Sequence, residues 1–184
     1  HRTENDLIAG TFGRGIYILD DYTPLRAIDR EALEQDVLLF APGRDVKWYR
    51  ESTLHTDSDG DSAFAAANPA HGATLTYYLK EGLKTAREVR QAAEEKMEAE
   101  GDYPTYPGWD TVESELDEAK PAVFLEIRDA SGAFVNRVSG DVGKGLHRIT
   151  WDMTTADYRA VRSPEGNDRT GAMAPPGTYS ATLM

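Results

Sequence analysis

The chain has 184 residues and a mass of 20.3 kDa, enough for one domain or for a domain with an appendage. Its 20 basic and 32 acidic residues give a net charge of −12. This charge argues against nucleic acid or an anionic membrane surface as a partner, because phosphate groups need local positive charge. No apolar run approaches the ~20 residues of a membrane span. The absence of cysteine excludes disulfides, zinc–thiolate sites and thiol catalysis.

The beginning of the sequence predicts a β-hairpin. Two apolar runs, Asp6–Thr11 and Ile16–Leu19, flank a turn that contains glycine. A two-stranded hairpin is marginally stable in water, so this one needs a sheet to join. We expect it to fold back on the rest of the chain or to pair with a second copy as a homodimer. Strands at both ends of the sequence also lead us to expect a piece of a longer protein.

Residues 23–36 are predicted to form a helical linker. Leu25, Ile28 and Leu33 can share one helix face, and Pro24 suits a first helical turn.

After this linker, the apolar residues alternate with polar ones as in β-strands. The alternation is cleanest from Ala73, where Leu75, Tyr77 and Leu79 point one way. Trp48 and Trp151 are expected in the core. Several short strands separated by Gly/Pro turns predict a β-sandwich over residues 37–184. The expected strands are 37–40, 46–49, 73–80, 122–128, 134–138, 145–152 and 178–183.

A helical insertion is predicted at about 83–118, between two of these strands. Residues 83–100 are rich in helix-forming Ala, Glu, Lys and Arg, and Gly101–Gly108 interrupts the helix. Asp110 and Glu113 resemble the capping box of a second helix, whose Val112 and Leu116 could pack inward. Residues 84–118 contain four basic and eleven acidic side chains, so they hold more than half of the net negative charge.

No pattern of residues identifies a catalytic, metal or cofactor site. Asp57–Asp61 has the carboxylate spacing of a calcium loop, but Gly60 is misplaced and the last ligand position falls on Asn68. We therefore interpret it as a solvated acidic loop. Gly10–Gly15 precedes an expected strand rather than a helix, which argues against a phosphate loop. The histidines lie far apart, without metal-ligand spacing, at His1, His55, His71 and His147.

One group of aromatic residues is a candidate ligand-binding site. Tyr103, Tyr106 and Trp109 lie within seven residues, among prolines and glycines. Exposed aromatic faces of this kind occur on sugar-binding surfaces. In the alternative interpretation the three rings pin the helical insertion onto the sandwich by burying apolar area.

The sequence also resembles a known family. The segment Glu4–Asp21, followed by Thr23–Arg26, resembles the last propeller blade of bacterial glycosyl hydrolase-like proteins with neuraminidase-type (BNR) repeats, which are similar to sortilin-type propellers. Seven further segments resemble the same family: Leu38–Pro42, Asn68–Pro69, Gly72–Ala73, Tyr77–Leu79, Val123–Ser131, Gly145–Asp152 and Ala174–Tyr179. The last two of them, Gly145–Asp152 and Ala174–Tyr179, are also similar to bacterial immunoglobulin-like modules.

This resemblance implies a domain organisation and a role. Residues 1–22 would be the remnant of a last propeller blade, and 37–184 an immunoglobulin- or fibronectin-like sandwich. The chain would be a non-catalytic accessory domain whose partner is the propeller of the same protein, in the periplasm or outside the cell. The parent protein could be a glycoside hydrolase, but the chain has no Asp-box repeat, so no catalytic residue is carried over. Two alternatives remain open: a carbohydrate-binding module that presents glycan to the propeller, and a hydrolase in its own right.

Overall fold

The computed structural model describes residues 5–43, 46, 70–157 and 171–184. The expected strand at 46–49, Trp48 and the Asp57–Asp61 loop lie wholly or mostly outside these ranges. The strands are β1 (Leu7–Thr11), β2 (Gly15–Leu19), β3 (Val37–Leu39), β4 (Ala73–Leu79), β5 (Val123–Asp129), β6 (Phe134–Gly140), β7 (Gly145–Trp151) and β8 (Tyr179–Leu183). The helices are α1 (Thr23–Ala27), α2 (Arg30–Glu34), α3 (Ala86–Ala99) and α4 (Trp109–Asp117).

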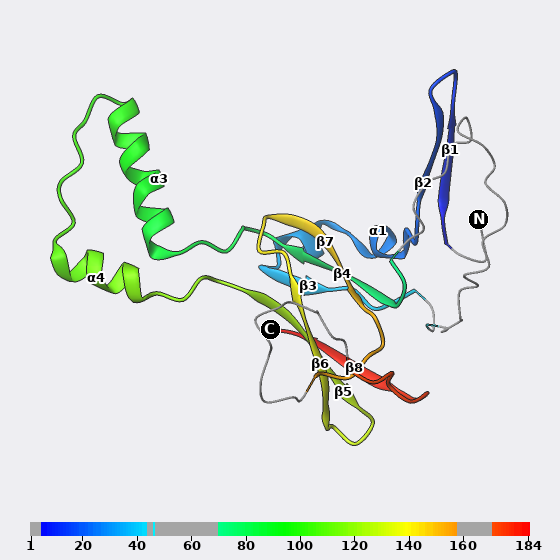
Figure 1. Ribbon diagram of the computed structural model, residues 1–184. Coiled ribbons are helices and arrows are strands. Elements are labelled where there is room, and N and C mark those ends of the chain that lie inside the picture. The colour runs from blue at the N-terminus through cyan, green and yellow to red at the C-terminus, as the bar shows by residue number, and fades with distance from the viewer. Residues whose placement is uncertain (1–4, 44–45, 47–69, 158–170) are drawn as a thin grey trace, which may run out of the picture.

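The protein is mainly β, and its strands form antiparallel sheets, as the sequence predicts. The described strands make one two-stranded sheet, β1-β2, and two three-stranded sheets in the orders β3-β4-β7 and β6-β5-β8 (Figure 1).

The central strand of the first three-stranded sheet is β4. Its apolar side chains Leu75, Tyr77 and Leu79 are buried, which confirms the predicted alternation. On the other side of this strand, the hydroxyls of Thr74 and Thr150 lie 2.8 Å apart, across the β4–β7 pair. The two faces of β4 therefore differ as the period of two requires.

A single core joins the two three-stranded sheets. Buried apolar side chains of β4, β5, β6 and β7 form one cluster, and Tyr179, Ala181 and Leu183 of β8 pack against it. The Trp151 and Tyr179 rings meet edge to face, with centroids 5.1 Å apart. Tyr77 is fully buried, and its hydroxyl donates to the carbonyl oxygen of Asp141 at 2.7 Å. Burial raises the pKa of the Tyr77 phenol.

The predicted helical linker is two short helices rather than one. The chain is extended at Ile28, and the Asp29 carboxylate caps α2 by accepting from the amide of Ala32 at 2.7 Å. Pro24 and Ala32 are the buried residues. The prediction that Leu25, Ile28 and Leu33 share one apolar helix face is wrong, because Leu25 and Leu33 are exposed and the helix is interrupted at Ile28.

The helical insertion lies where the sequence predicts it, between β4 and β5. Figure 1 shows α3 and α4 to one side of the three-stranded sheets. The predicted capping box at Asp110 is wrong, since α4 begins at Trp109 behind Gly108 without a side-chain cap. A capping box exists instead at Thr85 and Glu88, before α3.

The hairpin β1-β2 stands apart from the other sheets. Its strands pair in register from Leu7 with Leu19 to Thr11 with Gly15, and all ten residues are exposed. The expected folding back onto the strands of the core is wrong, because the hairpin projects away from them (Figure 1). At its base, the Arg148 guanidinium of β7 donates to the carbonyl oxygens of Asp20 and Asp21.

Candidate functional site

The three aromatic residues singled out from the sequence lie at the outer end of the helical insertion. Tyr103 and Tyr106 belong to the loop between α3 and α4, and Trp109 is the first residue of α4. Figure 1 shows this loop remote from the three-stranded sheets. The side chains are 92%, 59% and 78% exposed. The interpretation in which they pin the insertion onto the sheets is therefore wrong.

Two of these rings form a corner. The centroids of Tyr106 and Trp109 are 5.9 Å apart, and the ring planes meet at 71°. This edge-to-face geometry is a favourable one for an aromatic pair. Because the planes are not parallel, the pair cannot offer one flat platform. It offers two faces at an angle, which suit a compact ligand or a bent chain.

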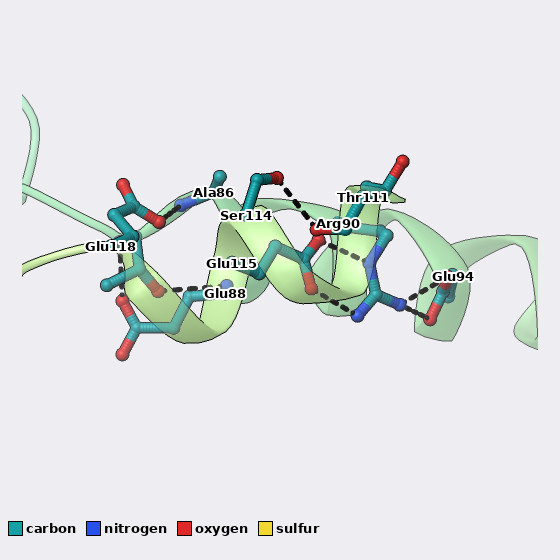
Figure 2. Close-up of polar contacts among 9 residues, drawn as sticks. Ala86, Glu88, Arg90, Glu94, Thr111, Ser114, Glu115 and Glu118 are labelled. Atoms are coloured by element: carbon teal, nitrogen blue, oxygen red, sulfur yellow. Dashed lines mark hydrogen bonds and ion pairs between the residues drawn. The ribbon is translucent and has the colours of Figure 1, made fainter. Parts of the chain in front are cut away.

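An ion-pair cluster joins the two helices that carry this corner. In Figure 2, the Arg90 guanidinium of α3 lies between Glu94 on its own helix and Glu115 on α4. Arg90 donates to both oxygens of Glu115, at 2.6 and 2.8 Å, and to both oxygens of Glu94, at 2.7 and 2.8 Å. The hydrogen bonds from Arg90 lower the pKa of Glu115, and those same bonds raise the pKa of Arg90.

This cluster also explains which face of α4 turns inward. Glu115 is buried, whereas Leu116 is 68% exposed, so the predicted inward packing of Leu116 is wrong. A carboxylate occupies the inner face because Arg90 supplies its counter-charge there.

The ends of the two helices nearest the sheets are tied as well. The Glu118 carboxylate, just after α4, accepts from the amide of Ala86 in the first turn of α3 at 2.7 Å (Figure 2). The Thr85 hydroxyl and the Glu88 carboxylate satisfy further amides of that turn. The insertion is therefore a braced pair of helices with the aromatic corner at its tip.

The charge around the corner restricts what can bind there. The insertion contains eleven acidic and four basic side chains between residues 84 and 118. Anionic ligands are repelled by such a field, whereas neutral ligands are not. The surroundings of the corner therefore disfavour an anionic ligand and allow a neutral or cationic one.

The candidate histidine His147 is held by contacts with neighbouring residues of the fold. His147 lies in β7, as expected, stacks on Tyr77 with centroids 5.2 Å apart, and bonds through Nε2 with the carbonyl oxygen of Gly143 at 2.8 Å. Among the described ranges, no group of three or more acidic or histidine side chains is placed to hold a metal ion. In the same part of the chain, no helix has the length and apolar character to cross a membrane.

Comparisons with protein-family models, curated proteins and solved structures found no match to this chain. The resemblance to BNR-repeat proteins thus stays a prediction.

The sequence analysis missed the ion-pair cluster. Arg90 and Glu94 are four residues apart on a helix, and this spacing predicts an ion pair between them. Glu115 lies 25 residues from Arg90, and no local pattern links them.

Proposed function

We propose that the chain is a non-catalytic accessory domain of a propeller protein, and that the hairpin β1-β2 completes the last blade of that propeller. The observation that carries this proposal is the hairpin itself. Its side chains Leu7, Ile8, Ile16 and Ile18 are all more than half exposed. A two-stranded sheet with apolar residues on both faces needs neighbouring strands, and a propeller blade of four strands offers them.

The rest of the chain is proposed to be an immunoglobulin- or fibronectin-like sandwich that braces the propeller. Two observations support this. The strand orders β3-β4-β7 and β6-β5-β8 fit such a sandwich with two sheets over one core. In addition, the Tyr179 hydroxyl at the start of β8 donates to the carbonyl oxygen of Pro175, four residues upstream. This bond resembles the tyrosine corner of immunoglobulin-like domains, in which a tyrosine near the start of a strand bonds to the backbone a few residues upstream.

Hydrogen exchange tests the role of the hairpin. We would compare the 184-residue chain with a longer form that includes the proposed propeller. Amides of residues 7–19 are expected to exchange rapidly in the short chain and to be protected in the long one. Amides of β5 serve as the control and should be equally protected in both. Equal exchange of the hairpin in both forms would exclude the proposal.

Light scattering tests the homodimer suggested by the sequence. If the hairpin pairs two copies, the chain is a dimer and Ile18→Lys converts it to a monomer, because a charge blunts an exposed strand edge. A wild-type monomer at high concentration would exclude this dimer and leave the propeller as the partner.

A second candidate function is favoured by the exposure of the aromatic corner. We propose, as the alternative, a carbohydrate-binding module that takes a neutral glycan between Tyr106 and Trp109, with Tyr103 beside them. Any hydrolytic activity would then reside in the propeller, and the protein would act in the periplasm or outside the cell.

A glycan array tests this alternative. Binding by the wild-type chain should be lost in Trp109→Ala and kept in Leu116→Ala, because both side chains are exposed on α4 but only the tryptophan belongs to the corner. Absence of binding by the correctly folded wild type, or equal loss in both variants, would exclude a glycan site at this corner.

A further inference from the structure

The aromatic corner of Tyr106 and Trp109 lies within an acidic stretch of the chain. No basic residue lies between Lys96 and Lys120, whereas eight acidic residues do. These acids are Glu98, Glu100, Asp102, Asp110, Glu113, Glu115, Asp117 and Glu118. Two of them have partners within the insertion, since Glu115 binds Arg90 and Glu118 accepts from the amide of Ala86. The others leave a net negative charge around a pair of exposed rings.

The helix α4 places one carboxylate on the same side as the Trp109 ring. Glu113 follows Trp109 by four residues, so the two side chains are neighbours on one face of the helix. Both side chains are exposed. Asp110 lies in the first turn of α4, where its charge offsets the partial positive charge of the helix N-terminus. A cation that stacks on Trp109 therefore has a carboxylate beside it.

The basic side chain that contacts α4 does not oppose such a cation. Arg90 donates to both oxygens of Glu115 and to both oxygens of Glu94, so two carboxylates compensate its charge. The same contacts hold α4 against α3 (Figure 2). A partner of the corner therefore does not have to order the two helices when it binds.

The chemistry of the corner selects a cation as its occupant. The faces of aromatic rings attract positive charge, most strongly in tryptophan, and the surrounding carboxylates add to this attraction. A second copy of the chain is disfavoured, because each copy has a net charge of −12. Arginine suits the site better than lysine, since its planar guanidinium stacks on a ring and donates to a carboxylate at the same time.

The exposure of the corner indicates that the cation belongs to a larger partner. A single cation–π contact at an exposed site strengthens binding by only about two- to fivefold. A small ion with one charge thus gains too little from the corner to stay bound. A segment with several positive charges also faces the carboxylates on both sides of the corner, and each of these attractions adds to the affinity.

We propose that the aromatic corner binds a basic, arginine-containing segment of another protein. One guanidinium stacks on Trp109 and pairs with Glu113, and further positive charges face the other carboxylates of residues 97–119. This site is separate from the hairpin and does not depend on the propeller. It gives the corner a different occupant from the neutral glycan considered above.

Titration of the 184-residue chain with a short peptide of alternating arginine and glycine tests this proposal. The peptide should bind more tightly than one of alternating lysine and glycine, which carries the same charge. Trp109→Leu, which removes the ring and keeps an apolar side chain, should weaken binding by about two- to fivefold, whereas Trp109→Phe should keep most of it. Circular dichroism checks that α3 and α4 remain folded in each variant.

A pair of charge variants separates the corner from the net charge of the chain. Glu113→Gln should weaken binding of the arginine peptide by about twofold or more, because it removes the carboxylate beside Trp109. The matched control is Glu95→Gln, which removes the same charge from an exposed position on α3 and should have a smaller effect.

Four results would overturn the proposal. The first is no saturable binding of the arginine peptide by the folded chain. The second is unchanged binding in Trp109→Leu with equal losses in Glu113→Gln and Glu95→Gln, which would show attraction to the net charge alone. The third is binding of a neutral glycan that depends on Trp109 without any binding of the peptide, which would assign the corner to a sugar. The fourth is self-association that Trp109→Leu abolishes, which would assign it to a second copy.

Discussion

Replacing Leu125 by alanine tests whether the two three-stranded sheets share one core. Leu125 lies in the middle of β5 and is 0% exposed. The substitution loses the transfer free energy of the deleted carbons and leaves a cavity, which together cost about 2–5 kcal/mol. Because β5 is hydrogen-bonded on both sides, to β6 and to β8, it cannot move to fill the space. We therefore expect the upper half of this range, about 3–5 kcal/mol of unfolding free energy.

Urea unfolding followed by two probes measures this loss. In a Trp48→Phe, Trp109→Phe background, tryptophan fluorescence reports on Trp151 in the core. Far-ultraviolet circular dichroism reports on the strands together with the helices α3 and α4. A domain of this kind has about 5–15 kcal/mol of stability, so the change in midpoint is large. The control is Leu146→Ala on β7, whose side chain is 44% exposed, and it should cost about 1 kcal/mol or less.

Two results would refute the reasoning. A loss below about 1 kcal/mol in Leu125→Ala would mean that β5 does not lie at the centre of a packed core. Separate transitions for the two probes would mean that the core around Trp151 does not unfold in one step with the rest of the secondary structure.

Three further predictions concern single positions. Gly72→Ala should lower the thermal midpoint more than Gly132→Ala: both glycines have positive φ, but only at position 72 would a Cβ lie 2.1 Å from a carbonyl oxygen of β7. Tyr77→Phe should cost about 1 kcal/mol in urea unfolding, since it removes one buried hydrogen bond. Hydrogen bonding by Arg128 lowers the pKa of Glu126, so unfolded chains bind protons more readily than folded ones. Stability should then fall as pH drops below about 4, and Glu126→Gln should flatten that dependence in acid-unfolding curves.

Much of the fold follows from local patterns. The alternation in β4 placed Leu75, Tyr77 and Leu79 on the buried face, and the same period held for β7 and β8. The composition of residues 83–100 predicted α3, since Ala, Glu, Lys and Arg favour helix wherever they lie. These properties depend on neighbours in sequence, so they can be derived from the sequence alone.

The candidate site depends on contacts between helices that local sequence patterns do not predict. Spacing indicated that Val112 and Leu116 could face inward. Val112 is half-buried, but Leu116 is exposed, and α4 turns Glu115 toward α3 because Arg90 lies there. Likewise, the sequence left open whether Tyr103 and its aromatic neighbours are buried or exposed.

The sequence by itself determined which segments are strands and helices and which side of each strand is apolar. Only the tertiary structure decided that the helical insertion stands away from the sheets, that Arg90 meets Glu115 across its two helices, and that its aromatic corner is exposed. The physical reason is that side-chain period is set by neighbouring residues. Burial, ion pairing across elements and the pairing of a strand's second edge depend instead on contacts between residues far apart in the chain.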